Sequence, residues 1–152
     1  QAERSLRSQL AAQQLIADSE NAFLDITLPD AKGQMQSLSQ YRGKVIVLDF
    51  SSTEMEQYVA YNFELRELYN QYHKQGLEIY SVGIERNLLA WEEATENLPW
   101  LTVRALDNEI TEVLTRYNVQ SLPTLFLFDK EGNVQGRYTD FTALEADINK
   151  YL

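Results

Sequence analysis

Three mostly apolar runs, each about as long as a strand, dominate the pattern along the chain. They cover residues 45–50, 77–84 and 121–128, and the last is entered through Pro123. Runs of this kind are typical of strands that are covered on both faces of a sheet. Asp49 is the only charged residue in the first run. The pattern therefore predicts three central strands, one of which carries a buried acid.

Between these strands, apolar residues are spaced as they are on one face of a helix. After the first run, apolar and aromatic residues recur at steps of three and four and predict a helix with one core-facing stripe. Further helices are expected over residues 88–96, from Asp107 or Asn108 to about Tyr117, and at the C-terminus, with Leu144 and Ile148 facing inward. The stripe of the first of these helices consists of Tyr58, Tyr61, Leu65, Leu68 and Tyr72.

Two S/T-x-x-E patterns predict where helices begin. Residues 53–56 and 142–145 both have the form of a capping box, in which the first and fourth side chains satisfy free N–H groups of the first turn. The first box places a helix start near Thr53 or Glu54. Glu54 and Glu56 would then lie on the first turn, where negative charge complements the helix dipole.

The remaining segments complete a three-layer α/β domain over residues 21–152. Residues 21–44 predict two short strands around a turn at 29–33, residues 101–103 an edge strand, and residues 134–138 a strand after a hairpin turn. Strands alternating with helices indicate this class of fold. Residues 1–20 predict a helix with a thin apolar face, either packed on the flank of the domain or serving as a linker or the tail of an upstream domain.

Length and charge narrow the range of functions. The 152 residues fit one domain, and the net charge of −10 disfavours sequence-independent binding of nucleic acid or docking on anionic membranes. No run approaches the ~20 apolar residues of a membrane-spanning helix. The sequence begins at Gln1 without a methionine, so a removed targeting segment is compatible with it.

The absence of cysteine is the strongest chemical constraint. It excludes disulfides, thiolate nucleophiles and cysteine-based metal sites. The single histidine, His73, is expected at a helix end, about 20 residues from Ser51, Ser52 and Thr53, which excludes a Ser-His pair. We therefore expect no catalytic residue, no metal site and no cofactor.

Residues 21–152 resemble the thioredoxin superfamily, and most closely the extracytoplasmic thiol-disulfide oxidoreductases of the TlpA/ResA type, which are related to the alkyl hydroperoxide reductase and thiol-specific antioxidant family. The most specific motif joins a helix end, a proline and a strand, as "Y-x-V-x-x-x-P-T" followed by "F-L-I-D-x-x-G". The matching segments are residues 23–33, Gly43-Lys44, residues 47–50, the helix carrying Leu65, Leu68, Tyr69 and Tyr72, residues 117–124 and residues 125–132.

The resemblance implies a thioredoxin-like fold with an N-terminal β-hairpin extension and an extra N-terminal helix. It also implies a cis peptide bond before Pro123, a location in the periplasm or another extracytoplasmic compartment, and a retained buried acid at Asp49. The family's C-x-x-C falls on Met55-Glu56-Gln57-Tyr58. Because thiol exchange requires a thiolate, we expect this site to be redox-inactive.

Recognition of a protein or peptide partner is the function that remains open to such a site. The candidate binding residues are Glu54, Met55, Tyr58, Tyr61, Leu122 and Pro123, because methionine and tyrosine suit protein contacts and the loop before the proline can accept an extended segment. Simple packing of these residues is an equal alternative. A further alternative is an oxidoreductase whose cysteines lie in another domain or partner.

Overall fold

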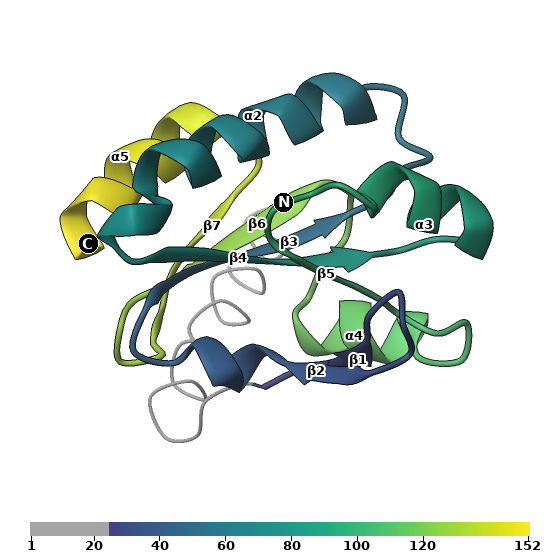
Figure 1. Ribbon diagram of the computed structural model, residues 1–152. Coiled ribbons are helices and arrows are strands. Elements are labelled where there is room, and N and C mark those ends of the chain that lie inside the picture. The colour runs from purple at the N-terminus through teal and green to yellow at the C-terminus, as the bar shows by residue number, and fades with distance from the viewer. Residues whose placement is uncertain (1–24) are drawn as a thin grey trace, which may run out of the picture.

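The computed structural model describes residues 25–152. The helix expected over residues 1–20 lies outside the described residues and stays a prediction. The described chain forms a two-stranded hairpin, a five-stranded sheet and four α-helices (Figure 1). The elements are β1 (Thr27–Pro29), β2 (Met35–Ser37), η1 (Leu38–Tyr41), β3 (Val45–Ser51), α2 (Tyr58–Tyr72), η2 (His73–Gln75), β4 (Leu77–Gly83), α3 (Leu88–Thr95), β5 (Leu101–Arg104), α4 (Ile110–Arg116), β6 (Thr124–Phe128), β7 (Val134–Tyr138) and α5 (Phe141–Tyr151).

The sheet has the strand order β5-β4-β3-β6-β7, with β3 in the centre. β3 pairs in parallel with β4 and antiparallel with β6, and β5 and β7 form the edges. In this register Asp49 lies between Ser81 of β4 and Leu125 of β6. The three apolar runs therefore form the three central strands, as the sequence pattern predicted.

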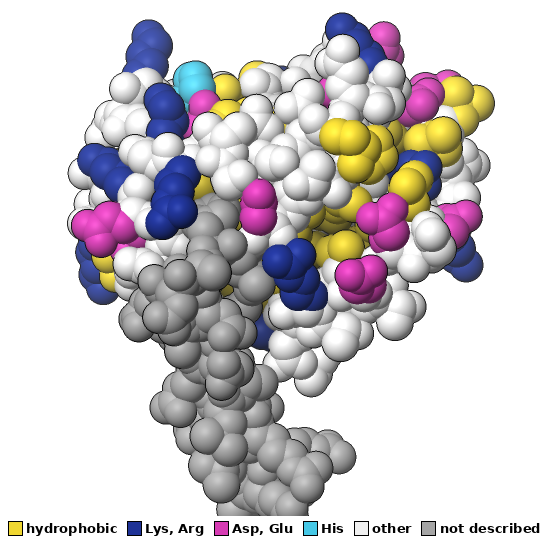
Figure 2. All heavy atoms as spheres, turned by 90° about the horizontal axis from the view of Figure 1, so that it is seen from below, with side chains coloured by type: hydrophobic (Ala, Val, Ile, Leu, Met, Phe, Trp, Pro, Cys, Tyr) yellow, Lys and Arg dark blue, Asp and Glu magenta, His cyan; other side chains and the backbone are white. Residues whose placement is uncertain are grey.

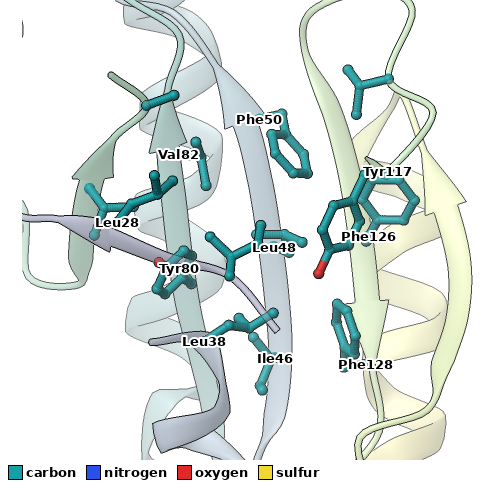
Figure 3. Packing of buried hydrophobic residues seen from close by; sticks show 14 of the residues in the cluster. Leu28, Leu38, Ile46, Leu48, Phe50, Tyr80, Val82, Tyr117, Phe126 and Phe128 are labelled. Atoms are coloured by element: carbon teal, nitrogen blue, oxygen red, sulfur yellow. The ribbon is translucent and has the colours of Figure 1, made fainter. Parts of the chain in front are cut away.

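The two faces of the sheet carry separate parts of the core. On one face, Ile46, Leu48 and Phe50 of β3 pack with residues of the hairpin, Tyr117 and α4 (Figure 3). On the other face, Val45 and Val47 pack under α2 and α5, which lie side by side above the sheet (Figure 1). Every residue of β3 is buried, because helices or the hairpin cover both faces. The three-layer α/β/α architecture and the N-terminal hairpin are confirmed.

Both capping-box predictions are wrong. α2 begins at Tyr58, after a turn, and the preceding N-cap residue, Gln57, makes no side-chain capping bond. The Thr53 hydroxyl instead donates to Glu85. α5 begins at Phe141, and the residue before it, Asp140, accepts a hydrogen bond from the Ala143 N–H. In each case a residue outside the S/T-x-x-E pattern makes the hydrogen bond: Glu85 accepts from Thr53, and Asp140 caps α5 in place of Thr142.

A close contact seats α3 against the sheet. Trp91 of α3 is buried, and its indole lies over Gly83 at the end of β4. A Cβ on Gly83 would lie 2.7 Å from the Trp91 Nε1 atom and 3.2 Å from the Glu85 Cγ atom. The absence of a side chain at position 83 is therefore what allows this helix to pack closely.

Replacing Gly83 with alanine should destabilise the fold. Because the added methyl group would overlap a buried ring, we expect Gly83→Ala to lower the free energy of unfolding by about 1–3 kcal/mol, measured by urea denaturation. Ala94→Ser, at an exposed position of the same helix, is the control and should change it by less than about 0.5 kcal/mol. Equal stability of the two variants would contradict the close contact.

Candidate functional site

The candidate site lies where β3 ends and the chain turns into α2. Residues 52–57 form this turn, and the resemblance places the two cysteines of the C-x-x-C motif at Met55 in the turn and at Tyr58, the first residue of α2. The segment 84–87, between β4 and α3, lies against the turn. The Leu122–Pro123 peptide bond, just before β6, is cis. Because β3 and β4 are parallel, the segments that follow them meet at the same end of the sheet. The loop before β6 lies at this end as well, because β6 is antiparallel to β3.

Asp49 is buried beneath the site and fully hydrogen-bonded. The Tyr61 hydroxyl of α2 donates to its Oδ1 atom, and the hydroxyls of Ser51 and Ser81 donate to Oδ2 at 3.1 and 2.7 Å. Trp100 Nε1 donates in turn to the Ser81 hydroxyl at 2.9 Å. The Thr53 hydroxyl, although close in sequence, bonds to Glu85 instead.

Burial governs the ionisation of this carboxyl group. Desolvation raises the pKa of Asp49 to about 6, and the hydrogen bonds from Tyr61, Ser81 and Ser51 oppose that rise. The same surroundings raise the pKa of Tyr61, because burial and the neighbouring carboxylate both disfavour a phenolate. Asp49 is thus a buried acid that changes charge in the mildly acidic range.

Two reciprocal sets of hydrogen bonds hold the turn against the segment 84–87. The buried Glu85 carboxylate accepts from the Thr53 N–H at 2.9 Å and from the Thr53 hydroxyl at 2.7 Å. The Glu54 carboxylate accepts from the Arg86 N–H at 3.0 Å and from its guanidinium at 3.0 and 3.3 Å. The expectation that Glu54 and Glu56 lie on the first turn of α2 is wrong, because both precede the helix.

A small polar cavity lies behind the turn. It has a volume of about 20 Å³, which is room for one water molecule. Asp49 and Glu85, the two buried carboxyl groups of the site, both line it, together with Tyr58 of α2 and Ser81. Burial first, and then the charges of Asp49 and Glu85, raise the pKa of Tyr58 to about 12. Tyr58 therefore faces polar surroundings and stays a neutral phenol at physiological pH.

An open apolar groove lies on the outer side of the turn. Its volume is about 420 Å³, and it combines side chains of the turn with others from the segment 84–87, α4 and the loop before β6. Figure 2, which views the molecule from below, shows hydrophobic side chains gathered in a hollow with charged side chains beside it. The residues that line the groove are Ser52, Glu54, Met55, Ile84, Glu85, Arg86, Ile110 and Leu122.

The candidate binding residues fall into two groups. Glu54, Met55 and Leu122 line the groove, and Pro123 adjoins Leu122 and is half-buried. Tyr58 lines the small cavity, and Tyr61 is buried against Asp49 and the ring of Phe141. The two tyrosines therefore do not belong to the groove.

Sequence reasoning did not name five residues of the groove as binding residues: Ile84, Glu85, Arg86, Ile110 and Ser52. One signal pointed to the first three, because they directly follow the central strand β4 at its carboxyl end, the edge where α/β sheets commonly place functional side chains. No comparable signal marks Ile110, since an apolar residue in the first turn of a helix is most simply part of the core.

A metal-binding cluster and a membrane-spanning helix are both absent from the described part of the chain. Within residues 25–152, no three histidine, cysteine, aspartate or glutamate side chains are placed to share a metal ion. No helix in the same range has the length and hydropathy needed to cross a membrane.

Comparison with known proteins agrees with this geometry. The sequence profile described as thioredoxin-like matches residues 43–134. The chain is 38% identical over 131 residues to the thiol-disulfide oxidoreductase ResA of Geobacillus kaustophilus, covering 84% of this chain and 72% of that protein. The chain belongs to the thioredoxin-like family.

Solved structures of thioredoxin-like proteins share the fold. An uncharacterised thioredoxin-like protein from Bacteroides vulgatus superposes with a TM-score of 0.77 at 35% identity, covering 85% of each chain. The thioredoxin domain of a thiol-disulfide oxidoreductase from the same organism gives a TM-score of 0.77 at 26% identity, covering 85% of this chain and 94% of that one. This thioredoxin-like chain differs from the family pattern in having no cysteine.

Asp49 should make the stability of this thioredoxin-like domain depend on pH. Below about pH 4 the group is protonated in both the folded and the unfolded state. Between about pH 4 and about pH 6 the folded state keeps the Asp49 proton that the unfolded state has already released, so stability falls as the pH rises through this range and stays lower above it. The rise of the Asp49 pKa to about 6 corresponds to a loss of about 3 kcal/mol in the free energy of unfolding.

Asp49→Asn should remove that loss. Relative to the unmodified chain, its free energy of unfolding in urea should rise by up to about 3 kcal/mol between about pH 4 and about pH 8. Glu93→Gln removes a carboxylate from an exposed position of α3 and is the matched control. If the Asp49→Asn variant and the unmodified chain keep a constant difference across this range, the carboxyl group is not a destabilising buried charge.

Proposed function

We propose that this chain is a redox-inactive thioredoxin-like domain that binds an extended segment of a protein or peptide. The observation that carries the proposal is the open apolar groove between the Met55 turn and Leu122, directly beside the Leu122–Pro123 peptide bond. It lies at the end of the sheet where the family carries its reactive cysteines.

The residues at the cysteine positions support the loss of redox chemistry. Thiol-disulfide exchange proceeds by attack of a thiolate on sulfur, and neither the thioether of Met55 nor the phenol of Tyr58 supplies one. The Tyr58 phenol is held neutral by burial and by the nearby carboxylates. Asp49, whose counterpart in active members resembles a proton acceptor, here accepts hydrogen bonds from Tyr61 and two serines.

The groove supports recognition of an extended chain. Met55, Ile84, Ile110 and Leu122 offer an apolar surface to a side chain of the partner, and methionine adapts readily to different shapes. The loop before Pro123 precedes the paired register of β6, whose partners begin at Thr124 and Leu125. Backbone groups of such a loop suit strand addition, while the groove would select the side chain.

The cellular setting follows from the resemblance. Similarity to extracytoplasmic oxidoreductases of the TlpA/ResA type supports a place in the periplasm or another extracytoplasmic compartment, as a binding or scaffolding module of a cell-envelope protein. Residues 1–20 would serve there as a terminal or linking helix.

The purified chain should show no disulfide-reductase activity. In an insulin-reduction assay with dithiothreitol we expect the rate with the chain to equal the rate of buffer, because no sulfur nucleophile is present. A purified C-x-x-C-containing ResA protein is the positive control. Turnover above buffer would contradict redox inactivity, and turnover only after adding a cysteine-bearing partner would favour the alternative of shared cysteines.

Binding should depend on the groove. Random linear peptides are selected on the unmodified chain, and the affinity of the enriched peptides is measured by fluorescence polarisation. Leu122→Asp and Met55→Asp should each weaken binding by about tenfold or more, because a charge in an apolar groove is desolvated by the peptide. Met35→Asp, at an exposed position of β2, is the matched control. The proposal would be contradicted if no enriched peptide bound Leu122→Asp and Met55→Asp more weakly than the unmodified chain.

A further inference from the structure

Glu85 is a buried carboxylate that the redox chemistry of the family does not explain. Its exposed fraction is 2%, and it lies in the segment between β4 and α3. Three donors of the turn converge on it: the Thr53 N–H at 2.9 Å, the Thr53 hydroxyl at 2.7 Å and the Ser52 hydroxyl at 3.4 Å. A carboxylate with three donors is held firmly, and it holds those donors equally firmly.

These hydrogen bonds determine the shape of the groove. Ser52, Glu54 and Met55 line it from the turn, whereas Ile84, Glu85 and Arg86 line it from the segment after β4. The Glu85 bonds join these two sides, and the ion pair of Glu54 with the exposed Arg86 adds a second tie that solvent screens. The buried bonds of Glu85 therefore help to set the distance between the two sides, beside the backbone bond from the Ile84 N–H to the Ser51 carbonyl at 2.9 Å.

Ionised and neutral Glu85 cannot hold the turn in the same way. The carboxylate only accepts hydrogen bonds, which suits three converging donors, whereas the neutral acid carries an O–H group that must itself donate. Protonation therefore requires a hydroxyl of Thr53 or Ser52 to turn from donor to acceptor or lose its bond, and it replaces charge-assisted hydrogen bonds with weaker neutral ones. The turn would loosen on the side that carries Met55.

The surroundings of Glu85 raise its pKa above that of an exposed glutamate. Burial raises its pKa, the nearby Glu54 carboxylate adds to the rise, and the bonds from Thr53 and Ser52 oppose it. Asp49 of β3 and Tyr58 of α2 line the small cavity behind Glu85 and are the other titratable groups there. The residues contributed to that cavity by α3 and β5 are Trp91, Thr95 and Thr102, which do not titrate.

We propose that Glu85 is a positioning residue that acts as a proton-sensitive clasp, so that the groove binds its partner when Glu85 is ionised and releases it when Glu85 is protonated. The release step rests on the proposed binding function, whereas the loosening of the turn does not. The two parts can be tested separately.

The clasp itself is tested by NMR without any ligand. The Thr53 amide proton should shift with a single transition as the pH is lowered from about 7.5 to about 4, because its acceptor is the carboxylate that titrates. Glu85→Gln should abolish the transition, and Asp49→Asn should retain it. A flat Thr53 amide in the unmodified chain, or a transition that persists in Glu85→Gln, would overturn the clasp.

A milder variant guards against misfolding of Glu85→Gln. Thr53→Val removes only the hydroxyl that donates to Glu85 and keeps the N–H. Because that hydroxyl stabilises the ionised carboxylate, the midpoint of the amide transition should move to higher pH. An unchanged or lower midpoint would count against the clasp.

Binding supplies the second readout. The affinity of a groove-selected peptide should fall by about tenfold or more between about pH 7.5 and about pH 4.5 in the unmodified chain, and Glu85→Gln should bind weakly and equally at both. Glu93→Gln on α3 should follow the unmodified chain. If no groove-dependent peptide exists, the proposed function fails while the NMR result still decides the clasp. If peptides bind with unchanged affinity at both values, release by protonation is wrong.

Discussion

Burial of β3 on both faces is the constraint on which the rest of the structure depends. Its alternate residues supply the two halves of the core, one under α2 and α5 and the other against the hairpin and α4. A polar side chain in such a strand is tolerated only when donors reach it. Asp49 meets this condition through Tyr61 of α2 and Ser81 of β4, so the acid links the covering helix to the neighbouring strand.

The turn after β3 shows how this chain retains a site without its reactive atoms. The resemblance matches positions 55 and 58 with the family's pair of cysteines; here Met55 lines the groove and Tyr58 lines the small cavity. Hydrogen bonds of Thr53 and Glu54 to residues 85 and 86 keep the turn in place. The thioredoxin-like scaffold, the apolar groove and the buried acid are therefore present in a chain that has no cysteine.

The sequence predicted the elements well because their signals are local. Residues 45–50 read as a buried strand from their own composition, and the stripe from Tyr61 to Tyr72 identified the helix that covers it. The capping box at residues 53–56 failed because Thr53 and Glu54 find partners 32 residues away, which no local pattern reveals. Ile110 was missed for the same reason, since only the folded chain brings α4 to the groove.

The reciprocal bonds between the turn and the segment after β4 also have a mechanical consequence. They join the ends of two parallel strands whose register runs from the Val45–Leu77 pair to the Ser51–Gly83 pair. Tension on a chain held in the groove would therefore be shared between β3 and β4 from the outset. The site is thus anchored in two central strands of the sheet, β3 and β4.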